Sequence, residues 1–326
     1  MDDAVMDLEV VGLRREADGV LAVELRDHRD RLLPAWAPGA HVDLAVGGHV
    51  RQYSLCGDPA DRRRYRVAVL RERDSRGGSA HVHERLRPGD EVEVGGPRNH
   101  FPLADAERHV LVAGGIGITP VLTMATELAA RGADWRLVYL GRSRRSMAFL
   151  EDLGRLDRGT KRSGAAAPEA HADRVTVHAD DVDGVPDLGR LLKGLDADTA
   201  LAVCGPPGLI AAVEAHCAEQ ELPAPRVERF AAAARDEHEE LTPFDVVVAS
   251  TGRRITVPAG RSALEALDEA GYALPNACRD GVCGSCLVGV VAGEPRHRDA
   301  LTEPDRTDVM APCVSRARSA ELVLDL

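Results

Sequence analysis

Lysine is almost absent from this sequence. Its 326 residues include only Lys161 and Lys193, so arginine supplies nearly all of the positive charge. An abundance of arginine is therefore no indication of phosphate-binding sites here. Asp and Glu total 53 against 41 Lys and Arg, which gives a net charge of −12. This excess of negative charge disfavours nucleic-acid binding, which needs a basic face.

Long hydrophobic runs are also missing. The first ten residues (MDDAVMDLEV) are acidic and lack the apolar core of a secretory signal, so we expect no export. No apolar run is long enough to span a membrane. A hydrophobic content of 44% still supports real cores, and a chain of this length predicts two or three domains. We expect a cytoplasmic protein with neither a nucleic-acid nor a membrane partner.

Cysteine, in contrast, is present seven times, and four of these residues form a pattern. Three follow the spacing C-x4-C-x2-C, and the fourth comes after 26 intervening residues: Cys278, Cys283, Cys286 and Cys313. This is the spacing of plant-type [2Fe–2S] ferredoxins, in which each iron takes two thiolates. Gly281 and Gly284 let the backbone curl around a cluster without Cβ clashes. The pattern predicts a one-electron carrier of low potential, on the order of −400 mV.

Two other interpretations of these cysteines fit the sequence less well. A structural zinc site usually has paired C-x2-4-C knuckles, and here the second knuckle is missing. Disulfide frameworks suit small secreted proteins, which this chain does not resemble. The remaining cysteines, Cys56, Cys204 and Cys217, are most simply buried free thiols.

The chain divides into three patterns of secondary structure. Residues 5–103 contain short apolar stretches between Gly and Pro turns, which predicts an antiparallel β-barrel. The expected strands there include 20–25, 41–46, 65–70 and 91–94, with a small helix at 79–86.

A second pattern begins near residue 108, where strands alternate with helices. We expect strands at 109–113, 136–140, 175–178 and 200–203 and helices at 119–131, 146–153 and 207–220. This alternation predicts a parallel α/β sheet. The stretch 157–173, rich in Gly, Ala and charge, is expected to be a surface loop.

A charged segment at 229–243 then indicates a domain boundary. It is followed by a hairpin-like pair at 244–249 and 254–257 and a helix at 262–270, an order that suits a small α+β ferredoxin domain. The expected organisation is a barrel (1–103), an α/β domain (104–229), a linker (230–242) and a ferredoxin-like domain (243–326).

Two glycine turns follow strands of the α/β region. In the first, residues 113–120, backbone N–H groups next to the glycines can approach a pyrophosphate, Thr119 can cap the following helix, and Pro120 suits its first turn. The second, residues 204–208, should reach the same carboxyl edge of the sheet. Each could also be a purely structural turn. No base is paired with Cys204 in the sequence, which argues against a nucleophilic role.

The barrel region contains a third candidate site at residues 51–55. Arg51 can clamp a phosphate, Tyr53 can pack on a flat ring, and the Ser54 hydroxyl can hydrogen-bond a ring nitrogen. Strand alternation places Arg51 and Tyr53 on one face. An ordinary strand explains the same residues. Residues 76–79 (RGGS) are a second possible phosphate cradle.

Taken together and in this order, the motifs resemble the phthalate dioxygenase reductase family, which includes the vanillate O-demethylase reductases. The resemblance covers essentially the whole chain. It implies a flavin-binding barrel, a nicotinamide-binding α/β domain and a C-terminal [2Fe–2S] ferredoxin domain.

Several residues match family motifs one by one. Arg51, Tyr53 and Ser54 match the R-x-Y-S flavin motif, while Gly78 and Ser79 match the flavin-phosphate turn. Gly115, Gly117, Thr119 and Pro120 match the pyridine-nucleotide loop, and Cys204, Gly205 and Pro206 match the C-G-P signature near the nicotinamide. Residues 228–230 (ERF) match the end of the nucleotide domain, where Phe230 would approach the flavin. Residues 96–101 and 313–316 match further family segments.

The implied function is that of an NAD(P)H-dependent reductase that delivers single electrons to a separate oxygenase, with a Rieske-type partner favoured. Ser54 would orient and stabilise the reduced flavin, and Cys204 would lie at the nicotinamide. The resemblance favours flavin mononucleotide. No clear aromatic platform for an adenine is present, but the sequence does not exclude FAD. The alternatives are a cytochrome P450 as the partner, a redox-sensing iron–sulfur protein without turnover, and a zinc-bound structural module.

The choice between NADH and NADPH depends on residues 141–145 (GRSRR). An acidic residue at this point would bind the ribose 2′-OH, whereas an arginine favours a 2′-phosphate. The segment has Arg142 and no acid. The resemblance favours NADH and the arginine favours NADPH, so both donors stay open.

Overall fold

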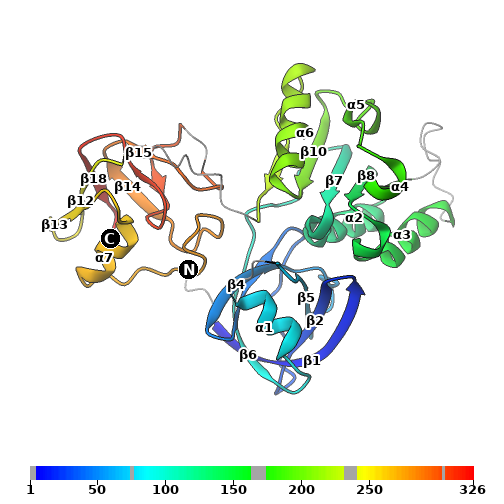
Figure 1. Cartoon of the computed structure of the whole chain (residues 1–326), viewed down its shortest axis with the longest axis horizontal. Helices are drawn as coiled ribbons and strands as arrows, with labels where there is room; N and C mark the ends of the chain where they lie inside the picture. The colour runs from blue at the N-terminus through cyan, green and yellow to red at the C-terminus, as the bar shows by residue number, and fades with distance from the viewer. Residues whose placement is uncertain (1–4, 74–76, 163–173, 231–240, 303–304) are drawn as a thin grey trace. The chain divides into compact units, whose positions relative to one another are not determined.

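The computed structural model describes residues 5–73, 77–162, 174–230, 241–302 and 305–326. The chain forms two compact units, Met1–Glu228 and Arg229–Leu326, which are described separately (Figure 1). Among the helices of these ranges, none combines the length and apolar character needed to cross a membrane.

An antiparallel sheet forms the first part of unit 1. Its strands are β1 (Val5–Ala17), β2 (Val20–Asp27), β3 (His41–Val46), β4 (His49–Ser54), β5 (Tyr65–Leu70) and β6 (Glu91–Arg98). They are ordered β4-β3-β6-β1-β2-β5, and a bridge between Leu55 and Val67 links the two edges into a barrel. Alternate residues fill the interior, as Val42, Leu44 and Val46 do from β3. The four expected strands and the small helix, α1 (Gly78–Glu84), are confirmed.

A parallel sheet forms the second part of unit 1. It is ordered β11-β10-β7-β8-β9, from strands β7 (Arg108–Gly114), β8 (Asp134–Gly141), β9 (Val175–Ala179), β10 (Thr199–Cys204) and β11 (Arg226–Glu228). Its longer helices are α2 (Ile118–Arg131), α3 (Leu150–Arg162) and α6 (Pro207–Glu219), with the short α4 (Asp180–Asp183) and α5 (Leu188–Leu191). The predicted α/β architecture is therefore confirmed.

The position of helix α3, which follows β8 and its turn, corrects the sequence analysis. Helix α3 starts at Leu150 and continues through residues 157–162, which were expected to belong to a loop. Acidic Glu151 and Asp152 in its first turn favour a helix start, and both pair with Arg155 one turn later. These local pairs outweigh the Gly, Ala and charge content that suggested a loop. Residues 163–173 of the expected loop lie outside the described residues.

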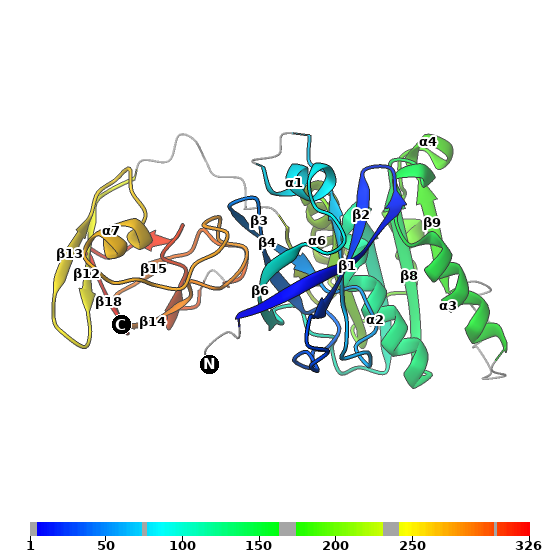
Figure 2. The ribbon, with the colours of Figure 1, turned by 90° about the horizontal axis from the view of Figure 1, so that it is seen from below.

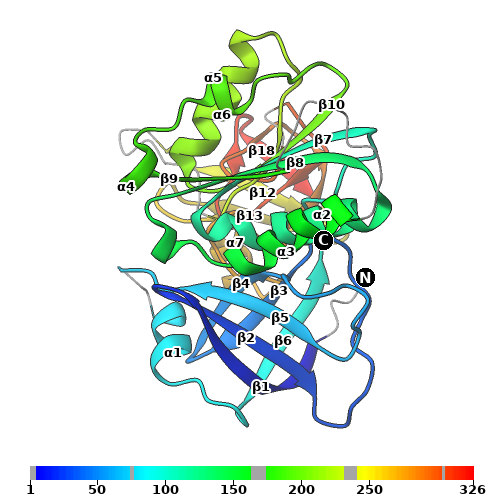
Figure 3. The same ribbon diagram turned by 90° about the vertical axis from the view of Figure 1, so that its right-hand side faces the viewer.

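The barrel and the parallel sheet share a core. Val20, Ala68 and Phe101 from the barrel side pack in one cluster with Ile118 and Met124 of α2. At the same junction the Arg66 guanidinium lies 5.2 Å from the Phe149 ring centroid. Figure 3 shows α2 and α3 between the sheet and the barrel. This packing fixes the carboxyl ends of the parallel strands relative to the barrel, so residues from both sheets can form one site.

Unit 2 contains a mixed five-stranded sheet, ordered β13-β12-β18-β14-β16. Its strands are β12 (Phe244–Val248), β13 (Arg254–Val257), β14 (Val288–Ala292), β16 (Val309–Met310) and β18 (Glu321–Leu324), and β15 (Pro295–Arg296) pairs with β17 (Arg316–Ala317). Helix α7 (Ala263–Glu269), labelled in Figure 2, starts with a capping box between Ser262 and Glu265. Its residues Ala263, Ala266 and Leu267 belong to the core of unit 2. The expected hairpin and helix are confirmed.

Candidate functional site

The two predicted glycine turns meet at the carboxyl edge of the parallel sheet. Strand β7 pairs with β10 in parallel register, with Ala113 opposite Cys204. The chain runs from β7 through β8 to β9 and then returns to β10 on the other side, so the strand order reverses between β7 and β10. Open α/β sheets bind ligands at such a switch point. The expectation that both turns lie on one edge is confirmed.

Close backbone contact explains why both turns contain glycine. A Cβ on Gly117 would lie 2.3 Å from the carbonyl oxygen of Cys204, and a Cβ on Gly205 would lie 3.0 Å from the Cα of Gly114. Gly115 has φ +54 and open space around its Cβ position, so a ligand can approach its backbone. The predicted role of Thr119 as a cap is wrong. Helix α2 begins one residue earlier, with Gly117 as N-cap, and the Thr119 hydroxyl donates to the Ile116 carbonyl 3.0 Å away.

Three polar side chains converge where the barrel meets this edge. Ser54 ends β4, Cys204 ends β10, and Glu228 ends β11, directly opposite Cys204 in parallel register. The Cys204 Sγ lies 3.9 Å from Glu228 Oε2 and donates to it. Ser54 is close enough to stabilise the charged form of Glu228, but its buried hydroxyl has no hydrogen bond of ordinary geometry. A buried hydroxyl without such a bond fits a surface that receives a polar ligand.

The electrostatics of these three residues keep the site neutral. Part of Glu228 remains accessible to solvent, yet protein surrounds its carboxyl and this burial raises its pKa to about 8. Burial, assisted by the nearby Glu228, raises the pKa of Cys204 well above its usual range. Cys204 is therefore a thiol and not a thiolate nucleophile, as the sequence analysis concluded.

Glu228 is the member of this group that sequence reasoning missed as a functional residue. The sequence analysis named it only as the start of a family segment. Strand β11 has just three residues and no apolar pattern, which explains why it was not expected. Recognising a short strand parallel to β10 would have placed Glu228 beside Cys204.

The residues proposed for the flavin lie in the barrel near α1. Arg51 and Tyr53 face the same side of β4, since their cross-strand partners Leu44 and Val42 both point into the barrel. The predicted alternation is confirmed. Burial raises the pKa of Tyr53 to about 12, so it stays a neutral phenol.

Gly78 and Ser79 begin α1 next to Arg51. A Cβ on Gly78 would lie 3.0 Å from Arg51 Cγ, so the arginine stem lies against the turn. The Ser79 hydroxyl is buried and accepts a hydrogen bond from the Glu72 N–H at 3.2 Å. Arg76 of the predicted phosphate cradle lies outside the described residues.

The arginine-rich turn after β8 has acidic neighbours. Arg142 is exposed, and its carbonyl accepts a 3.1 Å hydrogen bond from the N–H of Asp181. Asp180 and Asp181 begin α4, directly after the adjacent strand β9. Two acids therefore lie beside the segment 141–145, which has none, although they come about 40 residues further along the chain.

The four cysteines of unit 2 form two pairs. Cys278 Sγ lies 3.1 Å from Cys283 Sγ, and the neighbouring Cys313 lowers the pKa of the Cys286 thiol. Cys283 also accepts from the Ser285 N–H at 3.4 Å, and these hydrogen bonds, led by the one from Cys278, lower the pKa of its thiol to about 5. Two pairs of thiols match the needs of two irons, each of which takes two thiolates.

The backbone of the cysteine loop also fits a cluster. Gly281 and Gly284 have φ of 74° and 73°, the left-handed region that favours glycine and lets the loop curl tightly. Within the described ranges, no three His, Cys, Asp or Glu side chains gather tightly enough to hold a single metal ion. The paired arrangement of the thiols accounts for this in the cysteine loop.

Phe230 stands apart from these residues. It follows Glu228 by two positions, belongs to unit 2, and is 43% exposed. Residues 231–240 of the expected linker are outside the described part of the chain.

Comparison with known proteins agrees with this geometry. Residues 246–318 match the 2Fe-2S iron-sulfur cluster binding domain, and residues 111–215 match the oxidoreductase NAD-binding domain. The fold and the site define an NAD(P)H-dependent oxidoreductase with a ferredoxin-type [2Fe–2S] domain. The chain is 40% identical over 99% of its length to the vanillate O-demethylase oxidoreductase of Pseudomonas sp. (strain HR199 / DSM 7063), all of which is covered. It belongs to the family of oxygenase reductases that contains this protein and phthalate dioxygenase reductase.

Two solved structures are similar over 99% of the chain. Phthalate dioxygenase reductase has 36% identity and a TM-score of 0.68, with 98% of that structure covered. An intact type IV self-sufficient cytochrome P450 monooxygenase has 40% identity and a TM-score of 0.88, and the chain spans 41% of its length. The match to an iron–sulfur domain contains all four cysteines and overturns the zinc alternative, and the oxidoreductase relatives oppose a sensor without turnover.

Proposed function

We propose that this chain accepts a hydride from NADH or NADPH on a flavin and passes the electrons one at a time to an oxygenase. The observation that supports this most is the convergence of Ser54, Cys204 and Glu228 from two different sheets. A residue of the barrel and two residues of the nucleotide-binding sheet meet there. Such a junction is where a flavin held by the barrel and a nicotinamide held by the sheet would face each other.

Bound flavin would accept two electrons as hydride and release them singly, and a bound [2Fe–2S] cluster would carry one at a time. The chain's own residues position these groups. The Ser54 hydroxyl would donate to the flavin ring, Cys204 would pack against the nicotinamide, and Glu228 would hold or release a proton near pH 8. Phe230 would cover the flavin.

The binding residues follow the same division. Arg51, Gly78 and Ser79 would bind the flavin phosphate and Tyr53 its ring, and we propose flavin mononucleotide. The backbone of Gly115 and Gly117, with Thr119 and Pro120 in the first turn of α2, would hold the pyrophosphate of the nucleotide, and Gly205 and Pro206 would complete the nicotinamide pocket. We propose NADH as the preferred donor, because Asp180 and Asp181 adjoin Arg142 and are suited to a ribose hydroxyl.

The organisation that we propose has a flavin-binding barrel (1–103), a nucleotide-binding domain (104–229), a linker (230–242) and a ferredoxin domain (243–326). Cys278, Cys283, Cys286 and Cys313 would hold the cluster. The partner would be a separate oxygenase of the Rieske type. A cytochrome P450 is the second candidate, because the similar P450 monooxygenase contains a segment like this whole chain in the same polypeptide.

The experiment that tests the function is an anaerobic visible spectrum before and after addition of NADH, and then of NADPH. We expect flavin and iron–sulfur bands that both bleach, with faster bleaching by NADH. Flavin bands that bleach while the cluster stays oxidised would contradict the path from hydride to cluster. An anaerobic preparation without visible bands would contradict both cofactor sites.

A further inference from the structure

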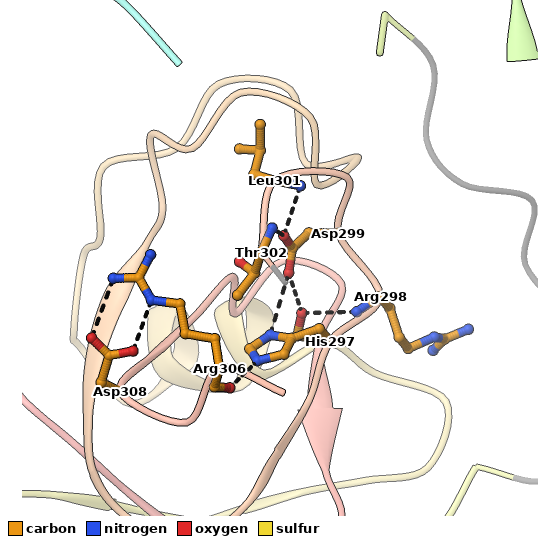
Figure 4. Close-up of polar contacts among 8 residues, drawn as sticks. His297, Arg298, Asp299, Leu301, Thr302, Arg306 and Asp308 are labelled. Atoms are coloured by element: carbon orange, nitrogen blue, oxygen red, sulfur yellow. Dashed lines mark hydrogen bonds and ion pairs between the residues drawn. The ribbon is translucent and has the colours of Figure 1, made fainter. Parts of the chain in front are cut away.

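A buried carboxylate lies behind the cysteine loop of unit 2. The Asp299 side chain is fully buried and the His297 side chain is 4% exposed, with Asp299 Oδ2 3.7 Å from His297 Nδ1. Figure 4 shows Asp299 at the centre of a set of polar contacts within the segment 297–302. Burying a charge is costly unless several donors satisfy it, so this arrangement requires an explanation.

Three donors satisfy Asp299. Its Oδ1 accepts from the N–H groups of Leu301 at 3.1 Å and Thr302 at 2.7 Å, and its Oδ2 accepts from the Ser315 hydroxyl at 2.9 Å. The Ser315 hydroxyl in turn accepts from the Arg298 N–H at 3.2 Å. Asp299 therefore orders its own turn and ties that turn to Ser315.

Ser315 connects this network to the fourth cysteine. The N–H groups of Val314 and Ser315 both donate to the Ala311 carbonyl, at 3.2 and 2.9 Å, and this tight turn contains Cys313. A hydrogen bond that holds Ser315 therefore fixes the end of the turn that presents Cys313.

Gly281 connects the same network to the other three cysteines. Its carbonyl accepts from the Ala300 N–H at 2.8 Å, and its backbone lies near enough to the Cys313 thiol to favour the thiolate. A Cβ on Gly281 would lie 2.5 Å from Val314 Cγ2 and 3.0 Å from Asp299 Cβ. The cysteine loop is thus packed at Gly281 against both the Asp299 turn and the Cys313 turn.

We infer that Asp299 is a positioning residue for the cluster, which it serves in two ways. Through Ser315 and Gly281 it holds the Cys313 turn against the cysteine loop and so slows loss of iron. Its buried negative charge also opposes addition of an electron nearby and so keeps the reduction potential low. The inference rests on the proposed cluster, whose presence in the unaltered protein is measured first.

Three variants of the full-length protein separate the two effects. Asp299→Asn removes the charge and weakens the bonds, while Ser315→Ala keeps the charge and removes the link to the Cys313 turn. Asp308→Asn is the matched control, since it makes the same chemical change at an exposed carboxylate in the same domain. The readouts are iron and sulfide content, the rate at which a chelator bleaches the cluster, and its reduction potential from a spectroelectrochemical titration.

We expect Asp299→Asn and Ser315→Ala to lose iron about tenfold faster than Asp308→Asn, as the loss of a hydrogen bond to a charged group implies. Asp299→Asn should also raise the reduction equilibrium constant about tenfold, which is about 59 mV for one electron. Ser315→Ala should shift the potential by less.

The inference would be overturned if Asp299→Asn lost iron at the same rate as Asp308→Asn and had the same reduction potential. If Asp299→Asn retains no iron, Ser315→Ala decides: faster iron loss supports the inference, and loss at the wild-type rate overturns it. Absence of a cluster from the unaltered protein would instead overturn the proposed function.

Discussion

The two redox sites of this chain are built in opposite ways. The cysteine loop takes three of its thiols from nine consecutive residues, 278–286, and two glycines with positive φ shape it locally. The proposed hydride site takes Ser54, Cys204 and Glu228 from the ends of three strands, and Ser54 is 150 positions from Cys204. The first site is specified by spacing, while the second depends on packing between two sheets. Changes to the loop should therefore abolish a cofactor, and changes at the junction should alter rates.

The largest effect is expected from Cys286→Ser. Removing one of four thiolates should abolish the cluster and with it electron delivery to one-electron protein acceptors, because each iron needs both of its thiolates. Oxidation of NADH with ferricyanide, which can take electrons from the flavin, should persist. Iron analysis and the two activity assays check this. Cys217→Ser, at a buried thiol outside the loop, is the control and should keep its iron.

Ser54→Ala should leave both cofactors bound and slow the chemistry. Losing one preorganised hydrogen bond at a reacting group costs about a hundredfold in rate. Stopped-flow flavin reduction by NADH measures it, with Ser250→Ala in unit 2 as the control. A flavin reduction rate within about twofold of the unaltered protein would show that the junction does not act on the flavin.

Glu228→Gln should remove a pH dependence. With a pKa raised to about 8 by burial, Glu228 should give flavin reduction an inflection near pH 8 that the variant lacks. Because this carboxyl binds more protons in the folded than in the unfolded chain between about pH 4.5 and 8, it lowers stability as pH rises through that interval. Thermal melts from pH 5 to 8 should therefore decline less in Glu228→Gln. If the pH dependence of flavin reduction were the same in Glu228→Gln, Glu228 would have no role in hydride transfer.

The smallest effect is expected at the nucleotide ribose. Arg142 and Asp181 are exposed, so solvent and salt screen their charges. Asp181→Asn should raise kcat/KM for NADPH relative to NADH only a few-fold, and Arg142→Ala should lower that ratio by a similar amount. Steady-state kinetics with both nucleotides measures this. If the two substitutions changed this ratio in the directions opposite to these, the two residues would not contact the ribose as proposed.

Local pattern predicted most of the elements that hold these sites. The strands 41–46, 65–70 and 254–257 were placed to the residue, because turns and alternation mark them clearly. Helix α3 was misplaced because the Gly, Ala and charge content of 157–173 suggested a loop, and the ion pairs of its first turns were not considered. Strand β11 was missed because three residues are too few to show a pattern and form a strand only beside β10.

The sequence by itself determined which cofactors this protein can hold. Cysteine spacing and glycine turns specify iron–sulfur and nucleotide chemistry through local backbone geometry. A few consecutive residues are enough to determine such geometry. Only the tertiary structure decided which side chains act together. Glu228 joins Cys204 through strand pairing, Asp181 joins Arg142 through a neighbouring connection, and Asp299 joins Ser315 through packing behind the loop. These contacts depend on distances between segments far apart in the chain, which folding sets and residue spacing does not.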